Sequence, residues 1–274
     1  RVQSVSVRLL VRRERERRSF EKAHYWDLKA KLICEGKTFE AKLFSLEKKK
    51  VANGSDFDEK TGQLKKGNKS IILNEAKASN LVESLSKVNW KLEKLEKKPT
   101  VRRPVPPFTT STLQQEANRK LRLSARETMR CAQGLYERGF ITYMRTDSVH
   151  LSEQAIKAAR ECVQLKYGEN YLSDKPRQFS SKAINAQEAH EAIRPAGENF
   201  RIPKETELSG RDLSLYDLIW KRTVASQMAE AKLTMINAEI SAGKAIFKSS
   251  GKSIDFPGFF RAYVEGSDDP GAAL

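Results

Sequence analysis

The spacing of hydrophobic residues changes several times along this chain. Val2, Val5 and Leu9 fall on one helix face, which predicts a helix over residues 1–19. Apolar and polar residues then alternate over 26–43, which predicts a β-hairpin. We further expect a solvated loop over residues 48–69, a helix over 79–85 and a strand over 90–95.

The middle of the chain has a helical pattern. Four prolines within residues 99–107 predict a stiff linker in front of it. Ser124 and Glu127 have the spacing of a capping box, which favours a helix beginning there. Helices are expected from a cap at Thr110 or Ser111 to Leu121, from Ser124 to Gly139, from Ser152 to Gly168, over 186–194 and over 213–228, with a short extended piece over 140–144.

The period of two returns toward the end of the chain. It covers residues 233–240 and 245–248 and resumes after a turn expected at Ser250-Gly251. The order is thus β, then α, then β. The simplest interpretation is an α+β, multidomain fold in which the two β regions join into one sheet and the helical block of residues 104–228 is inserted between them.

Charge indicates the kind of partner. The formal net charge is +16 and the isoelectric point is near 9.7. An excess of this size favours a polyanionic partner, nucleic acid above all. A ribosome-associated surface and simple solubility remain alternative explanations.

Cysteines and termini narrow the class further. Cys34, Cys131 and Cys162 have no C-x-x-C spacing and no nearby histidine, so we expect reduced thiols in an intracellular compartment rather than zinc or disulfides. No run reaches the roughly 18 apolar residues of a membrane span. The chain starts at Arg1 without an apolar leader, which suggests a fragment of a longer protein with no signal peptide.

The densest candidate for chemistry is the extended piece around Tyr143. A tyrosine hydroxyl can attack a phosphodiester and keep the energy of the broken bond in a phosphotyrosine link. Arg145, two residues on, would emerge on the same side and stabilise the negative charge that develops. Gln133 and Glu137 share one face of the preceding helix, for which a solvated helix face is the simpler explanation. Asp147 is also compatible with simply starting the next turn.

Several runs resemble signatures of bacterial type IA DNA topoisomerases. They are residues 107–117 (PFTTSTLQQEA), 132–139 (AQGLYERG) leading into 141–148 (ITYMRTDS), 187–195 (QEAHEAIRP), and residues 1–5 (RVQSV), which resemble the end of the family's A-G-R-V-Q-S element. These motifs stand in the family's order across about 195 residues. The chain is therefore identified as resembling this family.

The resemblance implies a role for each candidate residue. Tyr143 would be the nucleophile that takes the 5′ phosphate and leaves a free 3′ hydroxyl, and Arg145 would stabilise the scissile phosphate. The residues implied to contact DNA are Arg1, Gln3 and Ser4 in a groove for single-stranded DNA, and His190 with Arg194 one helical turn beyond it. Those implied to support the active-site pocket are Gln133, Glu137 and Asp147.

The family fold has four domains that form a torus around a hole large enough for DNA. On that map, residues 1–20 belong to a helical base domain. Residues 21–103 and 229–274 form a β-rich arch. Residues 104–228 form the helical domain that carries the nucleophile and swings away to open the gate.

The family's other half-site is an acidic Mg²⁺-binding fold, whose ligands would lie outside this chain. Asp56-Phe57-Asp58 has the D-x-D spacing, but no apolar strand precedes it, so no metal site is expected here. His190-Glu191 is not a zinc motif either, because Arg194 stands where H-E-x-x-H requires histidine. The fragment alone is expected to bind single-stranded DNA weakly and not to cleave it.

The resemblance implies an ATP-independent enzyme that relaxes negatively supercoiled DNA. We expect a monomer without membrane contact, in the cytoplasm and associated with the nucleoid. A plant organelle is the alternative, because residues 256–266 resemble cyanobacterial and plant-organelle members. Three other functions remain open: a non-catalytic DNA-binding module, a decatenating type IA relative, and half of a reverse gyrase.

Overall fold

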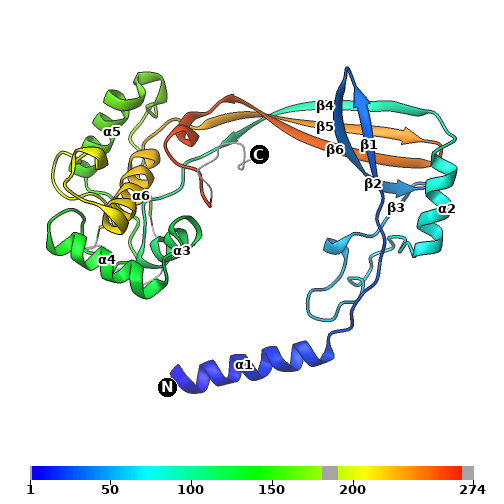
Figure 1. The fold of residues 1–274 in the computed structure, drawn as a ribbon, viewed down its shortest axis with the longest axis horizontal. Coiled ribbons are helices and arrows are strands. Elements are labelled where there is room, and N and C mark those ends of the chain that lie inside the picture. Colours follow the sequence, from blue (N-terminus) through cyan, green and yellow to red (C-terminus); the bar gives the residue numbers. More distant parts are fainter. Residues whose placement is uncertain (1, 181–190, 267–274) are drawn as a thin grey trace. The chain divides into compact units, whose positions relative to one another are not determined.

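The computed structural model describes residues 2–180 and 191–266. The chain divides into two compact units. Unit 1 comprises residues 1–98 and 235–251, and unit 2 comprises residues 99–234 and 252–274. Figure 1 labels the helices and strands used below.

Unit 1 begins with the predicted helix, α1 (Val2–Ser19), and the predicted hairpin of β1 (Lys29–Cys34) and β2 (Lys37–Leu46). Both predictions are confirmed. The hairpin turns through Glu35 and Gly36, whose φ angles of 48° and 76° suit a two-residue turn between twisted strands. Ala30 pairs with Ala41 and so shares its face of the sheet.

One six-stranded sheet has the order β1-β2-β6-β5-β4, with the short β3 (Lys49–Lys50) beside β2. The long strands are β4 (Trp90–Arg102), β5 (Ala231–Ala242) and β6 (Ala245–Phe256). The pairs of β2 with β1, β3 and β6 are antiparallel. The mixture of helix and antiparallel sheet agrees with the predicted fold class.

Two predictions about the strands are wrong. Ser250-Gly251 does not turn the chain, because both residues lie inside β6, which follows β5 through Gly243 instead. Likewise, β4 continues through Pro99 to Arg102 rather than ending in a proline linker at residue 99. Since β4 is at the edge of the sheet, Pro99 can sit in it without costing a hydrogen bond on its free side.

The core of unit 1 lies between one sheet face and α2 (Glu75–Leu85). Leu43, Ile240 and Phe247 are buried on the sheet side, and Leu85 is buried on the helix side. The helix starts four residues before the predicted position because the Asn74 side chain caps it. The loop predicted over residues 48–69 is less solvated than expected. Its residues 49–50 form β3, isolated bridges join Val51 to Ile71 and Phe57 to Leu64, and part of it is buried.

The described residues of unit 2 form four α-helices, which Figure 1 shows clustered together: α3 (Thr110–Leu121), α4 (Ala125–Glu137), α5 (Glu153–Tyr167) and α6 (Gly210–Ser226). Short 3-10 helices span Glu169–Tyr171, Pro203–Glu205 and Gly258–Arg261. Trp220, Leu113 and Leu135 are fully buried in the shared core. The predicted caps Ser124 and Ser152 are confirmed. The cap of α3 is Thr109, not Thr110 or Ser111, because the Thr110 hydroxyl is bonded elsewhere.

The helix predicted over residues 186–194 is also wrong for its described part. Residues 191–195 are extended, and Ile193 and Pro195 form bridges with Phe108 and Ile141. The stretch before Pro195 is disfavoured as helix, and its backbone N–H groups donate across to neighbouring segments instead. Residues 186–190 lie outside the described part of the chain.

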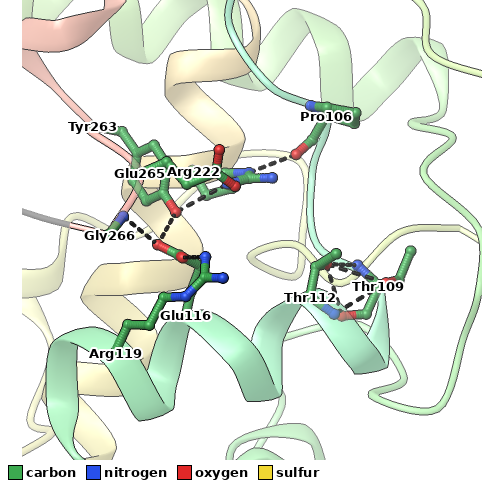
Figure 2. Close-up of polar contacts among 9 residues, drawn as sticks. All are labelled: Pro106, Thr109, Thr112, Glu116, Arg119, Arg222, Tyr263, Glu265 and Gly266. Atoms are coloured by element: carbon green, nitrogen blue, oxygen red, sulfur yellow. Dashed lines mark hydrogen bonds and ion pairs between the residues drawn. The ribbon is translucent and has the colours of Figure 1, made fainter. Parts of the chain in front are cut away.

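A buried polar cluster, which we call the Arg222 cluster, joins the two ends of unit 2 (Figure 2). The Arg222 side chain, 4% exposed, donates from Nε to the Pro106 carbonyl at 2.6 Å and from Nη1 to the Tyr263 hydroxyl at 2.9 Å. That hydroxyl donates to the Glu116 carboxylate at 2.8 Å. Glu116 also accepts from the Gly266 N–H.

The remaining members of the Arg222 cluster are Arg119, which donates to Glu116, and Glu265, which pairs with Arg222; Thr109 and Thr112 cap the start of α3 nearby (Figure 2). Leaving a buried hydrogen-bonding group without its partner costs about 1–3 kcal/mol. The cluster therefore holds together the segment that enters the helices and the segment that follows β6.

Because of the Arg222 cluster, we expect part of the unfolding free energy of unit 2 to be lost at acidic pH. Burial alone would raise the pKa of Glu116, but hydrogen bonds from Gly266, Tyr263 and Arg119 outweigh it and lower the pKa below the ordinary 4.5. The ionised carboxylate thus stabilises the fold above the unfolded-state pKa, and this contribution is lost as the pH falls through the folded-state pKa. Glu116→Gln should destabilise unit 2 at neutral pH, with the difference narrowing in acid.

Urea unfolding between about pH 7 and about pH 3 measures this narrowing. The exposed Glu207→Gln is the control and should show a small, pH-insensitive difference. If the loss of unfolding free energy caused by Glu116→Gln stays constant or grows in acid, ionised Glu116 does not stabilise unit 2 in this way.

Candidate active site

The segment between α4 and α5 presents alternate side chains to solvent. Gly139, with φ of 71°, turns the chain out of α4. From there Met144, Thr146 and Ser148 are buried, whereas Tyr143, Arg145 and Asp147 are exposed. Buried and exposed side chains thus alternate along residues 143–148. Tyr143 and Arg145 are both open to solvent.

Two threonine hydroxyls bind the backbone of this segment. Thr142 Oγ1 donates to the Ala192 carbonyl at 2.7 Å and accepts from the Arg194 N–H at 3.0 Å. Thr110 Oγ1, from the first turn of α3, donates to the Met144 carbonyl at 2.8 Å and accepts from the Thr146 N–H at 2.9 Å. Each hydroxyl thus uses both its donor and its acceptor capacity.

Tyr143 is 43% exposed and packs against a second tyrosine. Its ring meets the edge of Tyr136 on α4 at 5.4 Å between centroids and 70° between planes. Such edge-to-face pairs contribute about 0.5–1.5 kcal/mol beyond burial. The hydroxyl of Tyr143 is left on an open surface, where a large substrate can reach it.

Gln133 and Glu137 lie on the exposed side of α4, and Gln133 Nε2 donates to Glu137 Oε1 at 2.8 Å. The structure thus brings these two predicted residues together, one turn apart on the helix that carries Tyr136. The contact shown is the one between these two side chains. Their role in supporting the active-site pocket stays a prediction.

Arg194 is 8% exposed, and its guanidinium is already engaged. It donates to Glu191 Oε2 at 2.7 Å and to the Pro195 carbonyl at 2.8 Å. Glu191 in turn accepts from the Ser152 N–H at the start of α5. Burial would raise the pKa of Glu191, but the hydrogen bonds from Ser152 and Arg194 lower it on balance. These contacts hold Arg194 in place, and its predicted contact with DNA stays a prediction.

Four further residues are predicted to contact DNA. Gln3 and Ser4 are exposed in the first turns of α1, in unit 1. Arg1 and His190 lie outside the described residues, so their predicted roles stay predictions.

Residues 2–180 and 191–266 contain no group of three or more metal-ligating side chains that could hold an ion. The Asp56 carboxylate is used internally: it accepts from Lys50, the Asn53 N–H and Asn68. The Lys50 ammonium chiefly holds the pKa of Asp56 at about 2. The described residues therefore do not fit Mg²⁺, whose predicted ligands belong to another part of the protein. Among the same residues, no helix is long and apolar enough to cross a membrane.

Sequence reasoning missed Thr110, Thr142 and Tyr136. Thr110 and Thr142 stand beside apolar residues, as turn and cap residues commonly do. Their positions in the sequence therefore gave no indication of a role at the site. Tyr136 lies three residues after Gln133, and that helical spacing could have placed it on the same face.

With this geometry in view, the comparisons with known proteins are specific. A model of the family described as DNA topoisomerase matches residues 1–273, so the chain belongs to that family. The chain is 65% identical to DNA topoisomerase 1 of Synechococcus elongatus, 61% to that of Synechocystis and 49% to that of Streptomyces coelicolor. The predicted resemblance to the bacterial type IA enzymes is confirmed.

These alignments cover all of this chain but only 31%, 30% and 30% of the relatives, so the chain spans about a third of their length. Among solved structures, full-length topoisomerase I from Thermotoga maritima matches 95% of the chain and 39% of its own, with a TM-score of 0.70 and 31% identity. The fold is therefore that of part of a type IA topoisomerase.

Proposed function

We propose that this chain supplies the nucleophile of an ATP-independent type IA DNA topoisomerase that relaxes negatively supercoiled DNA. The observation that carries the proposal is the exposure of Tyr143 and Arg145 on a short segment that hydrogen bonds of Thr110 and Thr142 hold in place. Family membership supports the reaction class. A net charge of +16 fits a DNA substrate.

In the proposed reaction, the Tyr143 oxygen attacks a backbone phosphorus of single-stranded DNA. The bond to the 3′ oxygen breaks, which leaves a 3′ hydroxyl and a 5′ phosphate joined to the tyrosine. Arg145 stabilises the charge on the phosphoryl oxygens. After another strand has passed, the 3′ hydroxyl attacks the phosphotyrosine and restores the chain. No ATP is needed because the phosphodiester energy is kept in the covalent link.

The proposed domain map follows the family. Residues 1–20 contribute to the base domain, 21–103 and 229–274 to the arch, and 104–228 to the helical domain that carries Tyr143. The residues proposed to contact DNA are Arg1, Gln3, Ser4, His190 and Arg194. Those proposed to support the pocket are Gln133, Glu137 and Asp147. We propose a monomer in the cytoplasm, associated with the nucleoid, with Mg²⁺ held by residues beyond this chain.

Replacing Tyr143 by phenylalanine in the full-length protein tests the nucleophile. Relaxation should fall by at least about a thousandfold, because no other group takes over the covalent step. DNA binding should be nearly unchanged. Gel-based relaxation and equilibrium binding to a single-stranded oligonucleotide measure the two effects.

Tyr136→Phe is the matched control, since this ring touches Tyr143 and is 42% exposed. It should keep its activity because the ring contact survives. Relaxation that persists in Tyr143→Phe, or is lost equally in both variants, would refute the assignment of the nucleophile.

Arg145→Ala in the full-length protein should slow oligonucleotide cleavage by about 10²–10³-fold, in the range found when a transition-state donor is removed. Binding affinity should change little. Arg126→Ala removes an equal charge from the exposed side of α4 and should leave the cleavage rate intact. Equal losses in the two variants would assign Arg145 to general electrostatic attraction.

A non-catalytic DNA-binding role has one observation in its favour for the isolated chain, namely that its described residues hold no acidic metal cluster. The 274-residue chain should therefore bind a labelled oligonucleotide without forming a covalent adduct. The adduct should appear in the full-length protein. Adduct formation by the isolated chain would show that this chain is sufficient for cleavage.

A further inference from the structure

We propose that Thr110 and Thr142 are positioning residues, whose hydroxyls set the direction in which Tyr143 and Arg145 leave the backbone. This inference rests on the proposed function. It concerns residues whose side chains never reach the reacting atoms, because both are bonded to backbone groups.

The Thr110 hydroxyl binds the two peptide groups that flank Arg145, and the Thr142 hydroxyl anchors the residue before Tyr143 to residues 192 and 194. Thr142 immediately precedes Tyr143, and its hydroxyl and N–H join this position to residues 192–194: the N–H donates to the Arg194 carbonyl at 2.9 Å. Thr110 binds the carbonyl of Met144 and the N–H of Thr146, which lie on the two sides of Arg145. Tyr143 is therefore held from both of its neighbours.

Backbone contacts of Thr110 reinforce this arrangement. Its own N–H donates to the Thr146 carbonyl at 2.9 Å, so residues 110 and 146 exchange hydrogen bonds in both directions. This N–H belongs to the first turn of α3, where N–H groups have no partner within the helix. The start of α3 thus binds the segment that bears Arg145.

Side-chain packing cannot replace these bonds at the exposed positions. Tyr143 is 43% exposed and Arg145 is exposed, so packing constrains these side chains less than it constrains core residues. The direction of each Cα–Cβ bond is therefore determined by its flanking peptides. A displacement of about 1 Å at a reacting group can cost about a hundredfold in rate, so small rotations of these peptides matter.

A purely structural role makes a different prediction. Loss of a buried hydroxyl that satisfies a carbonyl and an N–H destabilises a protein by about 1–3 kcal/mol wherever it occurs. Thr223 provides the comparison: it is fully buried in α6 of the same unit, and its hydroxyl donates to the Ile219 carbonyl at 2.9 Å. It too donates to a backbone carbonyl, but within its own helix, and it is remote in sequence from residues 140–148.

The test uses the full-length protein with Thr110→Val, Thr142→Val and Thr223→Val, and with the serine variants at 110 and 142. Valine keeps the branched shape and removes the hydroxyl, whereas serine restores it. Three quantities are measured for each: the rate of covalent adduct formation at saturating oligonucleotide, the Kd for that oligonucleotide, and the temperature of unfolding.

Thr110→Val and Thr142→Val should lower the saturated cleavage rate by at least about tenfold while Kd stays within about twofold. Serine should restore most of the rate. Thr223→Val should lower the unfolding temperature comparably and leave the rate unchanged. Saturated rates equal to that of Thr223→Val would overturn the proposal, as would serine variants as slow as the valine ones.

If a valine variant does not fold, the alanine variants at 110, 142 and 223 are compared at a temperature where all three stay folded, and equal rates again overturn the proposal. Tyr143→Phe, measured in the same experiment, distinguishes failure of the proposed function from failure of the positioning role. A cleaving Tyr143→Phe refutes the proposed function itself. An inactive Tyr143→Phe together with fast Thr110→Val and Thr142→Val refutes only the positioning role.

Discussion

One buried guanidinium organises unit 2. Arg222 donates to the Pro106 carbonyl on the incoming chain and to the Tyr263 hydroxyl on the outgoing chain, and that hydroxyl reaches Glu116 on α3. A buried charge must be paired and hydrogen-bonded, so these segments have to converge for the unit to fold. Four residues after Pro106, the first turn of α3 presents Thr110 to the nucleophile segment. The position of Tyr143 thus depends, through a short chain of bonds, on a residue far away in the sequence.

Stability and chemistry are separated at the site. The backbone of residues 140–148 is bound by hydroxyls and by cross-bridges, and the inward side chains pack in the core. The outward side chains contribute little to that core. An exposed tyrosine is a poor nucleophile unless its surroundings activate it, and the part of the chain described here offers it Arg145 as a nearby cation. In the proposed enzyme, further activation would come from groups outside the described residues.

Local signals in the sequence predicted local structure well. The capping box at Ser124 and Glu127 and the cap at Ser152 correctly located the starts of α4 and α5, and alternation correctly located the first hairpin. Predictions failed where contacts with distant residues determine the local conformation. Residues 191–195 form bridges with Phe108 and Ile141 instead of a helix. Strand β4 continues past Pro99 because it lies at the edge of the sheet. The motifs pointed to Tyr143 and Arg145, whereas Thr110 and Thr142 could be recognised only from contacts across 34 to 50 residues.

The alternation of buried and exposed side chains after residue 142 also has an evolutionary consequence. Selection for a folded protein acts on positions 144, 146 and 148, while selection for strand cleavage would act on 143, 145 and 147. A gene copy released from its catalytic duty would therefore drift at every second position here and keep the others. Substitutions at every second position of this segment would identify a descendant that still folds but no longer cleaves DNA.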